Sequence, residues 1–270
     1  MERSNQFGRK GTLINLFLAL LFSCASDAEI IATPVDYQQQ GTTLKGFIAY
    51  DNQFSGKRPA VLVVHEWWGH NEYARKRAKM LAKLGYTALA VDMYGNGKQA
   101  AHPEEAGKFA SEIAQHRDVG IARFEAAMTL LKNNETVDKN KIAAIGYCFG
   151  GAVVLEMARA GLDLDGVVSF HGSLATQAPA RNGRVKAKIL VAHGEKDPFV
   201  KPEDVENFKK EMDAAGVDYH FNVYPDALHS FTNPDATSYG EKFNLPLKYD
   251  ESADHQSWAD MKRFLKRVFQ

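Results

Sequence analysis

The residues best suited to chemistry lie in the segment 146–151 (GYCFGG), between an apolar β-type run at 141–145 and a helical run at 152–159. Small residues two positions before and after Cys148 permit the tight strand-to-helix turn of a nucleophile elbow, with cysteine in place of serine. This turn holds the sulfur at the N-terminal end of the following helix, which favours a thiolate. The other cysteine, Cys24, lies near the N-terminus. We therefore interpret Cys148 as a nucleophile rather than as a buried structural cysteine.

A cysteine nucleophile needs a base, and the base needs a partner that orients it. Asp197 follows the β-type run 189–192, and His229 follows the run 220–224. Alone, Asp197 would be interpreted as a turn former and His229 as a solvated loop residue. Their order after the cysteine is that of the α/β-hydrolase triad. We predict that Cys148, Asp197 and His229 form a catalytic triad.

The reaction of an ester with a thiolate also requires hydrogen-bond donors for the oxyanion. One N–H group should come from Phe149, and we expect the other from Trp67, in the segment 65–70 (HEWWGH) that follows an early strand. This segment resembles the zinc motif H-E-x-x-H, but its second histidine is five residues after the first, which turns it away on a helix. No metal site is therefore predicted.

Apolar β-type runs alternate with helical segments along the chain, which predicts a doubly wound, mostly parallel sheet flanked by helices. The expected strands are 46–50, 60–65, 87–91, 142–146, 166–170, 189–192 and 220–224. The expected helices are 71–84, 103–133 with a break near His116, 151–160, 202–215 and 258–269. We assign residues 29–270 to one α/β domain with a single-domain α/β-hydrolase fold.

The first 28 residues have the order of a secretory signal peptide: basic residues, the apolar stretch 13–22 and then small residues. Cleavage is expected after Ala25 or Ala28, and ten apolar positions are too few for a stable membrane span. The predicted location is outside the cytoplasm, in a bacterial periplasm. Two alternatives are a lipoprotein acylated at Cys24 and a cytoplasmic protein with a hydrophobic N-terminus.

Composition argues against several classes of partner. Lysine plus arginine and aspartate plus glutamate both number 33, so the net charge of 0 gives no indication of nucleic acid or an acidic membrane surface. A single cysteine after the predicted signal peptide excludes an internal disulfide there. The sequence contains no Walker loop and no dinucleotide fingerprint, so no cofactor is expected. It does not predict an oligomeric state.

Four segments together closely resemble the dienelactone hydrolases, which are cysteine members of the α/β-hydrolase superfamily. They are 146–151 (GYCFGG), 194–198 (GEKDP), 228–231 (LHSF) and 65–69 (HEWWG), and the likeness extends from about Ala49 to the C-terminus. The resemblance implies that Cys148 is the nucleophile, His229 the base and Asp197 its orienting partner. It also implies that Glu66 helps to deprotonate the thiol when substrate arrives.

The substrate site departs from this family. Dienelactone hydrolase reads a substrate carboxylate through two arginines, and the matching positions here are Asn96 and Asn233. Asparagine cannot supply the bidentate, charge-assisted contact of arginine, and Lys98 is at most a partial substitute. A neutral ester or lactone is therefore the expected small-molecule substrate. Tyr94 and His171 follow strand ends and, with Glu66, are predicted to bind it, although each of the two could simply be packing.

These observations predict a carboxylic ester or lactone hydrolase that forms an acyl-enzyme thioester. Two other classes stay open at this level. One is a non-catalytic ligand-binding protein on a hydrolase fold, which would be marked by a broken triad. The other is an exported redox-sensitive thiol protein, although the predicted mature chain holds no second cysteine to complete a redox cycle.

Overall fold

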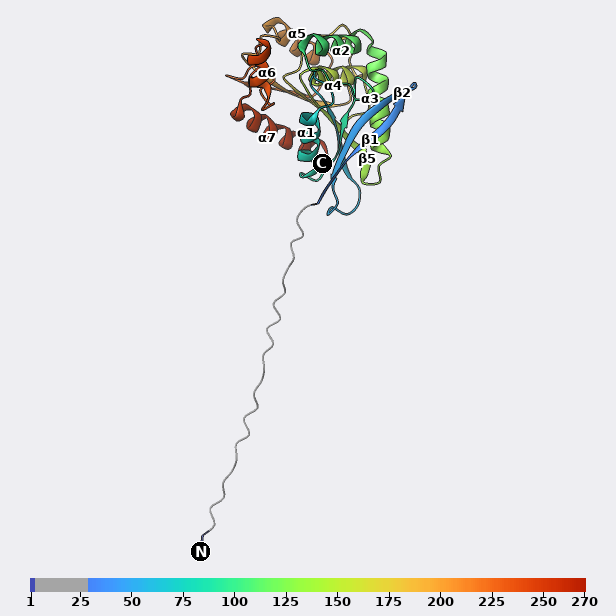
Figure 1. Cartoon of the computed structure of the whole chain (residues 1–270), viewed down its shortest axis with the longest axis vertical. Coiled ribbons are helices and arrows are strands. Elements are labelled where there is room, and N and C mark those ends of the chain that lie inside the picture. Colours follow the sequence, from blue (N-terminus) through green and yellow to red (C-terminus); the bar gives the residue numbers. More distant parts are fainter. Residues whose placement is uncertain (3–28) are drawn as a thin grey trace.

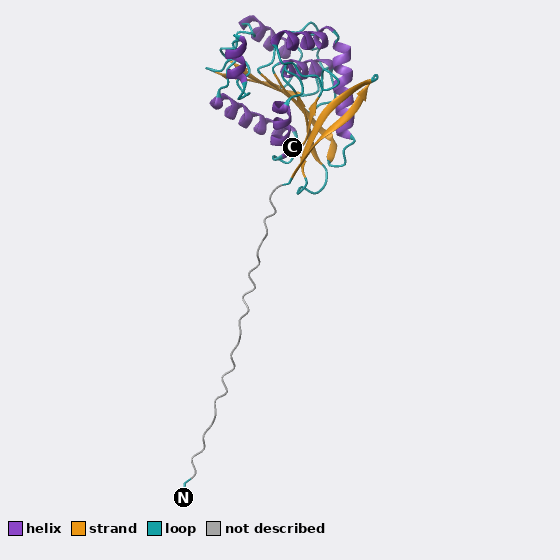
Figure 2. Cartoon of the chain, in the orientation of Figure 1, coloured by secondary structure: helices purple, strands orange, loops and turns teal. Residues whose placement is uncertain are grey.

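A twisted sheet with helices on both faces forms the centre of the computed structural model, which describes residues 1–2 and 29–270 (Figures 1 and 2). Within these residues the sheet has eight strands in the order β1-β2-β4-β3-β5-β6-β7-β8. Their bounds are β1 (Ile30–Gln39), β2 (Thr42–Asp51), β3 (Arg58–Val64), β4 (Thr87–Val91), β5 (Val137–Tyr147), β6 (Gly166–Phe170), β7 (Lys188–Gly194) and β8 (Tyr219–Tyr224). The pairs β1–β2 and β2–β4 are antiparallel, and all others are parallel.

Two layers of helices cover the sheet. The helices are α1 (Glu72–Ala82), α2 (Pro103–Gln115), α3 (Arg117–Lys132), α4 (Phe149–Ala160), α5 (Pro202–Ala214), α6 (Ala236–Phe243) and α7 (Glu251–Val268). Buried side chains of α3, α4 and α5 form one apolar cluster on one face, whereas those of α1 and α7 form a second cluster on the other. The predicted doubly wound fold class is therefore confirmed.

The central strand β3 shows why continuous apolar runs mark these parallel strands. Leu62 and Val64 belong to the first cluster, and Val61 and Val63 belong to the second, because successive side chains point to opposite faces. All four side chains are fully buried. Such a strand loses no stability by lacking polar residues, since neither face meets water.

Some elements differ from the sequence prediction. The strand β1 was not predicted, and β2 begins four residues earlier than expected. The helix α6 was not predicted either, and α7 begins at Glu251, where the Asp250 side chain accepts a hydrogen bond from the Ala253 N–H. The predicted break near His116 is confirmed, because α2 ends and α3 begins on either side of this residue.

Residues 3–28 lie outside the described residues and contain Cys24 and nearly all of the predicted signal peptide 1–28, so the signal peptide and the lipoprotein alternative stay predictions. Among the helices that the structure does describe, none combines the length and apolarity required to cross a membrane.

Candidate active site

Cys148 lies in a strained turn between β5 and α4, with φ of 54° and ψ of −115°. A β-carbon on Gly146 would lie 2.0 Å from the Gly150 carbonyl oxygen, and one on Gly150 would lie 2.3 Å from the Val64 oxygen. Larger residues at these two positions would push the backbones apart. Glycine at 146 is thus explained by close contact within the elbow, and glycine at 150 by close contact of the elbow with the end of β3.

His229 and Asp197 meet at the same edge of the sheet as the elbow. The His229 Nδ1–H donates to Asp197 Oδ2 at 2.7 Å, and Asp197 Oδ1 accepts from the Phe199 N–H at 2.9 Å. Burial opposes protonation of His229, but the charge of Cys148, the hydrogen bond that His229 donates to Asp197, its hydrogen bond with Cys148 and the charge of Asp197 outweigh burial and raise the pKa of His229 to about 10. The three residues predicted as a triad therefore lie together.

A cavity of about 200 Å³ opens beside Cys148 and His229. Its wall is mostly apolar and is formed by Trp67, Cys148, Phe149, Ala152, Ser173, Phe199, Val200, His229 and Leu247. Within the described part of the chain, the N–H groups of Trp67 and Phe149 have no hydrogen-bond acceptor. Both predicted oxyanion donors are therefore in the wall of the cavity and available to a ligand.

Tyr94 lies behind this wall rather than in it. Its side chain is 3% exposed, and its hydroxyl donates to the Trp67 carbonyl oxygen at 3.0 Å. Its ring packs against Phe149 with centroids 5.2 Å apart. Tyr94 therefore supports both oxyanion residues, and it does not line the cavity as a substrate-binding residue would.

His171 also differs from its predicted place, since it lies beneath the elbow and not in the cavity wall. Its Nδ1 accepts at 3.1 Å from the Cys148 N–H, which also donates to the Phe170 carbonyl oxygen at 3.0 Å, and its Nε2–H donates to Thr232 Oγ1 at 2.7 Å. Burial, with the positive charges of His229 and Arg77, lowers the pKa of His171 well below its ordinary value. The ring is thus neutral and can accept the backbone hydrogen bond of the nucleophile.

A chain of buried hydrogen bonds continues from His171 through the core, and we call it the support chain. Thr232 Oγ1 lies 2.6 Å from the Tyr73 hydroxyl, which in turn accepts from Arg77 Nε at 3.2 Å. Arg77 is anchored by Asp254 at 2.6 Å. The backbone of the nucleophile is therefore connected to α1 and α7 through side chains that are distant in sequence.

Glu66 is buried with incomplete hydrogen bonding. Its Oε2 accepts from Asn233 Nδ2 at 2.5 Å, whereas Oε1 has no partner of acceptable geometry among the described residues, although Ser230 lies near the carboxylate. Burial raises the pKa of Glu66 above its ordinary value, while Asn233 and the charge of His229 act in the opposite direction. The carboxyl group lies behind the cavity wall and is suited to exchanging a proton.

The two asparagines at the arginine positions lie in different surroundings. Asn233 is buried against Glu66. Asn96 is exposed with φ of 56°, and its N–H donates to the Thr43 carbonyl oxygen at 2.7 Å. Lys98 is also exposed, with its ammonium group over the Phe109 ring. None of these three residues lines the cavity that contains Cys148.

In the segment 65–70, both ring nitrogens of His65 are used in hydrogen bonds to the backbone. His65 Nδ1–H donates to the Glu66 carbonyl oxygen at 2.6 Å, and its Nε2 accepts from the Met93 N–H at 3.3 Å. Neither nitrogen of His65 is left to bind a metal. Over residues 29–270, no group of three or more histidine, cysteine, aspartate or glutamate side chains is arranged to hold an ion.

Comparisons with known proteins agree with this geometry. The model of the dienelactone hydrolase family matches residues 44–269. A protein from Aquifex aeolicus named as a carboxymethylenebutenolidase is 31% identical over 205 residues, which cover 74% of this chain and 86% of that protein. The crystal structure of a dienelactone hydrolase-like promiscuous phosphotriesterase from metagenomic libraries has a TM-score of 0.83 and 36% identity, covering 89% of this chain and 99% of the other.

Proposed function

The chain belongs to the dienelactone hydrolase family and is an ester or lactone hydrolase, and from this premise we propose that it works through a Cys148–His229–Asp197 triad and an acyl-enzyme thioester. The elbow cysteine, the Asp197–His229 pair at 2.7 Å and two unpaired backbone N–H groups lie around one cavity, and this arrangement supports the proposal.

The first step is formation of the thiolate. The thiol proton passes to His229, whose pKa is raised to about 10, so the resulting imidazolium is stable at neutral pH beside Asp197. Glu66 lies close enough to His229 for their charges to interact. As a buried carboxylate that readily accepts a proton, it assists the ionisation when substrate displaces water from the cavity.

Acylation and deacylation then use the same groups. The thiolate attacks the carbonyl carbon, the N–H groups of Trp67 and Phe149 hold the oxyanion, and His229 gives its proton to the leaving oxygen. A water molecule then transfers a proton to His229, attacks the thioester and releases the acid. Esters and lactones suit this mechanism better than amides, because sulfur is expelled more easily than an amine.

The substrate is a neutral ester or lactone. The cavity wall contains no arginine or lysine that could bind a carboxylate, and the two positions at which the family carries arginine are occupied by asparagines outside the wall. A substrate carboxylate would be desolvated there without a charged partner, which is unfavourable.

The test is release of p-nitrophenol from a short-chain ester by the purified protein and by Cys148→Ala. We expect the substitution to lower kcat/KM by more than a thousandfold, and we expect mass spectrometry of the wild-type protein to show the acyl group on Cys148. Equal rates in the two proteins would show that the nucleophile is wrongly assigned. A folded wild-type protein without activity on neutral or carboxylated esters and lactones would favour a ligand-binding role.

A further inference from the structure

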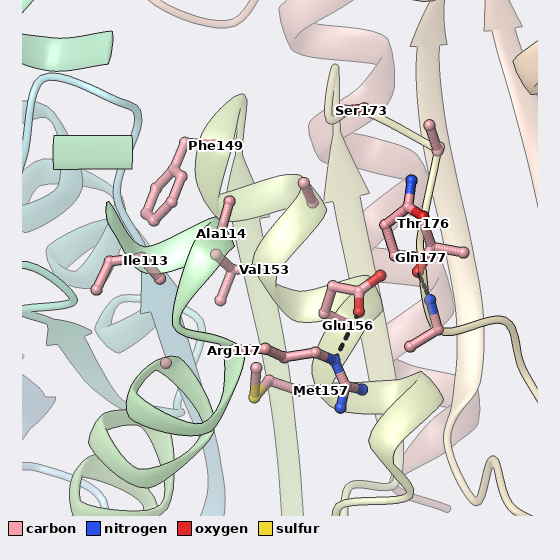
Figure 3. A pocket seen from close by; sticks show the side chains of 14 residues that line it. Ile113, Ala114, Arg117, Phe149, Val153, Glu156, Met157, Ser173, Thr176 and Gln177 are labelled. Atoms are coloured by element: carbon pink, nitrogen blue, oxygen red, sulfur yellow. Dashed lines mark hydrogen bonds and ion pairs between the residues drawn. The ribbon is translucent and has the colours of Figure 1, made fainter. Parts of the chain in front are cut away.

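One side of α4 lines a second cavity of about 340 Å³ (Figure 3). The helix contributes Phe149, Ala152, Val153, Glu156 and Met157. These positions have the spacing i, i+3, i+4, i+7 and i+8, so they form one continuous stripe that begins next to the nucleophile. The opposite walls are formed by Ile113, Ala114, Arg117, Gly120, Ser173, Ala175, Thr176, Gln177 and Ala178.

The second cavity adjoins the one that contains Cys148. Phe149, Ala152 and Ser173 line both. His229, Phe199 and Leu247 line only the first. A ligand that is bonded to the sulfur and extends past Ala152 and Ser173, away from the histidine, would enter the second cavity along α4.

The position of the histidine decides which half of an ester occupies this space. His229 must give a proton to the leaving oxygen, so the alcohol half lies on the His229 side of the first cavity. The acyl half lies on the other side of the carbonyl carbon, toward Ala152 and Ser173. We propose that the second cavity is a subsite for an unbranched acyl chain of medium length, an assignment that rests on the thioester mechanism proposed above.

The far end of the subsite limits the length of the chain. Arg117 Nε binds Glu156 Oε2 at 3.1 Å, as Figure 3 shows, and Arg159 Nη1 binds Glu156 Oε1 at 3.0 Å. From Phe149 to Glu156 the helix rises about 10 Å. An extended chain advances roughly 1.2 Å per bond, so about eight carbons reach the ion pair.

The character of the walls favours hydrocarbon over a charged group. Ile113, Val153, Met157 and Phe149 offer apolar surface along the length of the subsite. The charge of Arg117 is already balanced by Glu156. A neutral chain gains from leaving water there, whereas an anionic end group would have to compete with an existing ion pair.

The experiment compares p-nitrophenyl acetate, butanoate, hexanoate, octanoate and dodecanoate with the full-length protein. The blocking variant is Ala114→Trp, which places a large ring into the subsite from an exposed position on α2. The matched control is Gln115→Trp at the next position, which is exposed and does not line the subsite. We expect the wild-type kcat/KM to be highest near the octanoate. Ala114→Trp should lower the octanoate-to-acetate ratio of kcat/KM at least tenfold, and the control should not change this ratio.

Other outcomes separate this proposal from the mechanism. If the ratio is the same in Ala114→Trp and wild type while Cys148→Ala is inactive, the subsite is wrong and the nucleophile stands. If Ala114→Trp impairs octyl acetate instead of the octanoate, the cavity binds the alcohol half, and our assignment of the acyl half is overturned.

If Cys148→Ala retained full activity, the thioester mechanism would be wrong, and the subsite would then be tested by a binding measurement. Sodium octanoate and sodium acetate would be titrated into wild type and Ala114→Trp by calorimetry. Octanoate binding that is at least tenfold weaker in the variant would support the subsite without reference to turnover. Equal binding in both proteins would overturn it.

Discussion

The loops after β3 and β4 each begin near a buried carboxylate, but the two carboxylates differ in how many hydrogen bonds they accept. Asp92, after β4, accepts four backbone N–H groups, from Lys45, Tyr94, Gly95 and Gly97, at 2.8 to 3.1 Å. Glu66, after β3, has one side-chain amide and an oxygen without a well-formed hydrogen bond. A buried carboxylate whose oxygens are saturated with backbone hydrogen bonds fixes the loop, whereas one with an unsatisfied oxygen is available for proton transfer.

A third buried carboxylate, Asp197, should show the largest effect on activity when it is replaced. One oxygen accepts the backbone N–H of Phe199 and the other accepts from His229. We expect Asp197→Asn to lower kcat/KM about a thousandfold, or about 4 kcal/mol, because the amide no longer stabilises the imidazolium. Asp226→Asn, at an exposed aspartate paired with Lys196, is the matched control and should retain full activity.

The pH dependence of the same variant sharpens this prediction. The pKa of His229 is raised to about 10, so the imidazolium that protonates the leaving group should be lost only as the pH rises through 10. Removal of Asp197 removes two of the causes that raise this pKa. The alkaline limit of kcat/KM should therefore move to lower pH in Asp197→Asn. The same alkaline limit in both proteins would contradict the role of Asp197.

Asp92→Asn tests the carboxylate that accepts four backbone hydrogen bonds. The amide group would turn a donor toward backbone N–H groups and leave at least one of them unpaired. We expect the free energy of unfolding to fall by about 3 kcal/mol, measured by urea denaturation with Asp226→Asn as the control. The kcat/KM of the molecules that remain folded should change little. A variant as stable as wild type would show that the four hydrogen bonds do not hold the loop.

Glu66→Gln tests the carboxylate that has one oxygen without a well-formed hydrogen bond. We expect kcat/KM to fall about thirtyfold, or about 2 kcal/mol, because the neutral amide cannot assist transfer of the thiol proton to His229. Burial raises the pKa of Glu66, so its charged form destabilises the fold above that pKa. At pH 8 the variant should therefore be at least as stable as wild type. A loss of stability equal to that of Asp92→Asn would remove the distinction between the two loops.

The smallest effect should come from the support chain, through Thr232→Val. The isosteric side chain leaves His171 and Tyr73 without their shared partner, which should cost about 1 kcal/mol of stability. It should also lower kcat a few-fold with KM unchanged, because the elbow is held less firmly. Thr232→Ser keeps the hydroxyl and should restore kcat. If both variants behave alike, the hydroxyl does not position the nucleophile.

The sequence predicted the parts of this site whose signals are local. Cys148, Asp197 and His229 each follow a β-type run, and the glycines are recognised by their spacing around the cysteine, although the contact that requires glycine at 150 is with the distant residue Val64. The edge strand β1 was missed because it is only partly buried and its apolar residues are interrupted by polar ones and by Pro34. The short helix α6 was missed because it has only eight residues and contains a glycine at 240, a poor helix former.

The roles of His171 and Tyr94 could not be predicted for a different reason. Both were placed correctly at strand ends, but a strand end does not show whether a side chain turns into the cavity or beneath it. The partner of His171 is Thr232, 61 residues away, and the partner of Thr232 is Tyr73, 159 residues away. Only the folded chain brings these residues together, and no spacing in the sequence marks them.

The strained backbone of Cys148 sets activity against stability when this protein is selected for heat resistance. A non-glycine residue held at φ of 54° costs about 1 kcal/mol or more, and glycine would relieve most of that cost. Cys148→Gly should therefore melt at a higher temperature than wild type while losing the sulfur. Laboratory evolution for heat resistance alone would favour the loss of this cysteine, so activity has to be selected together with stability.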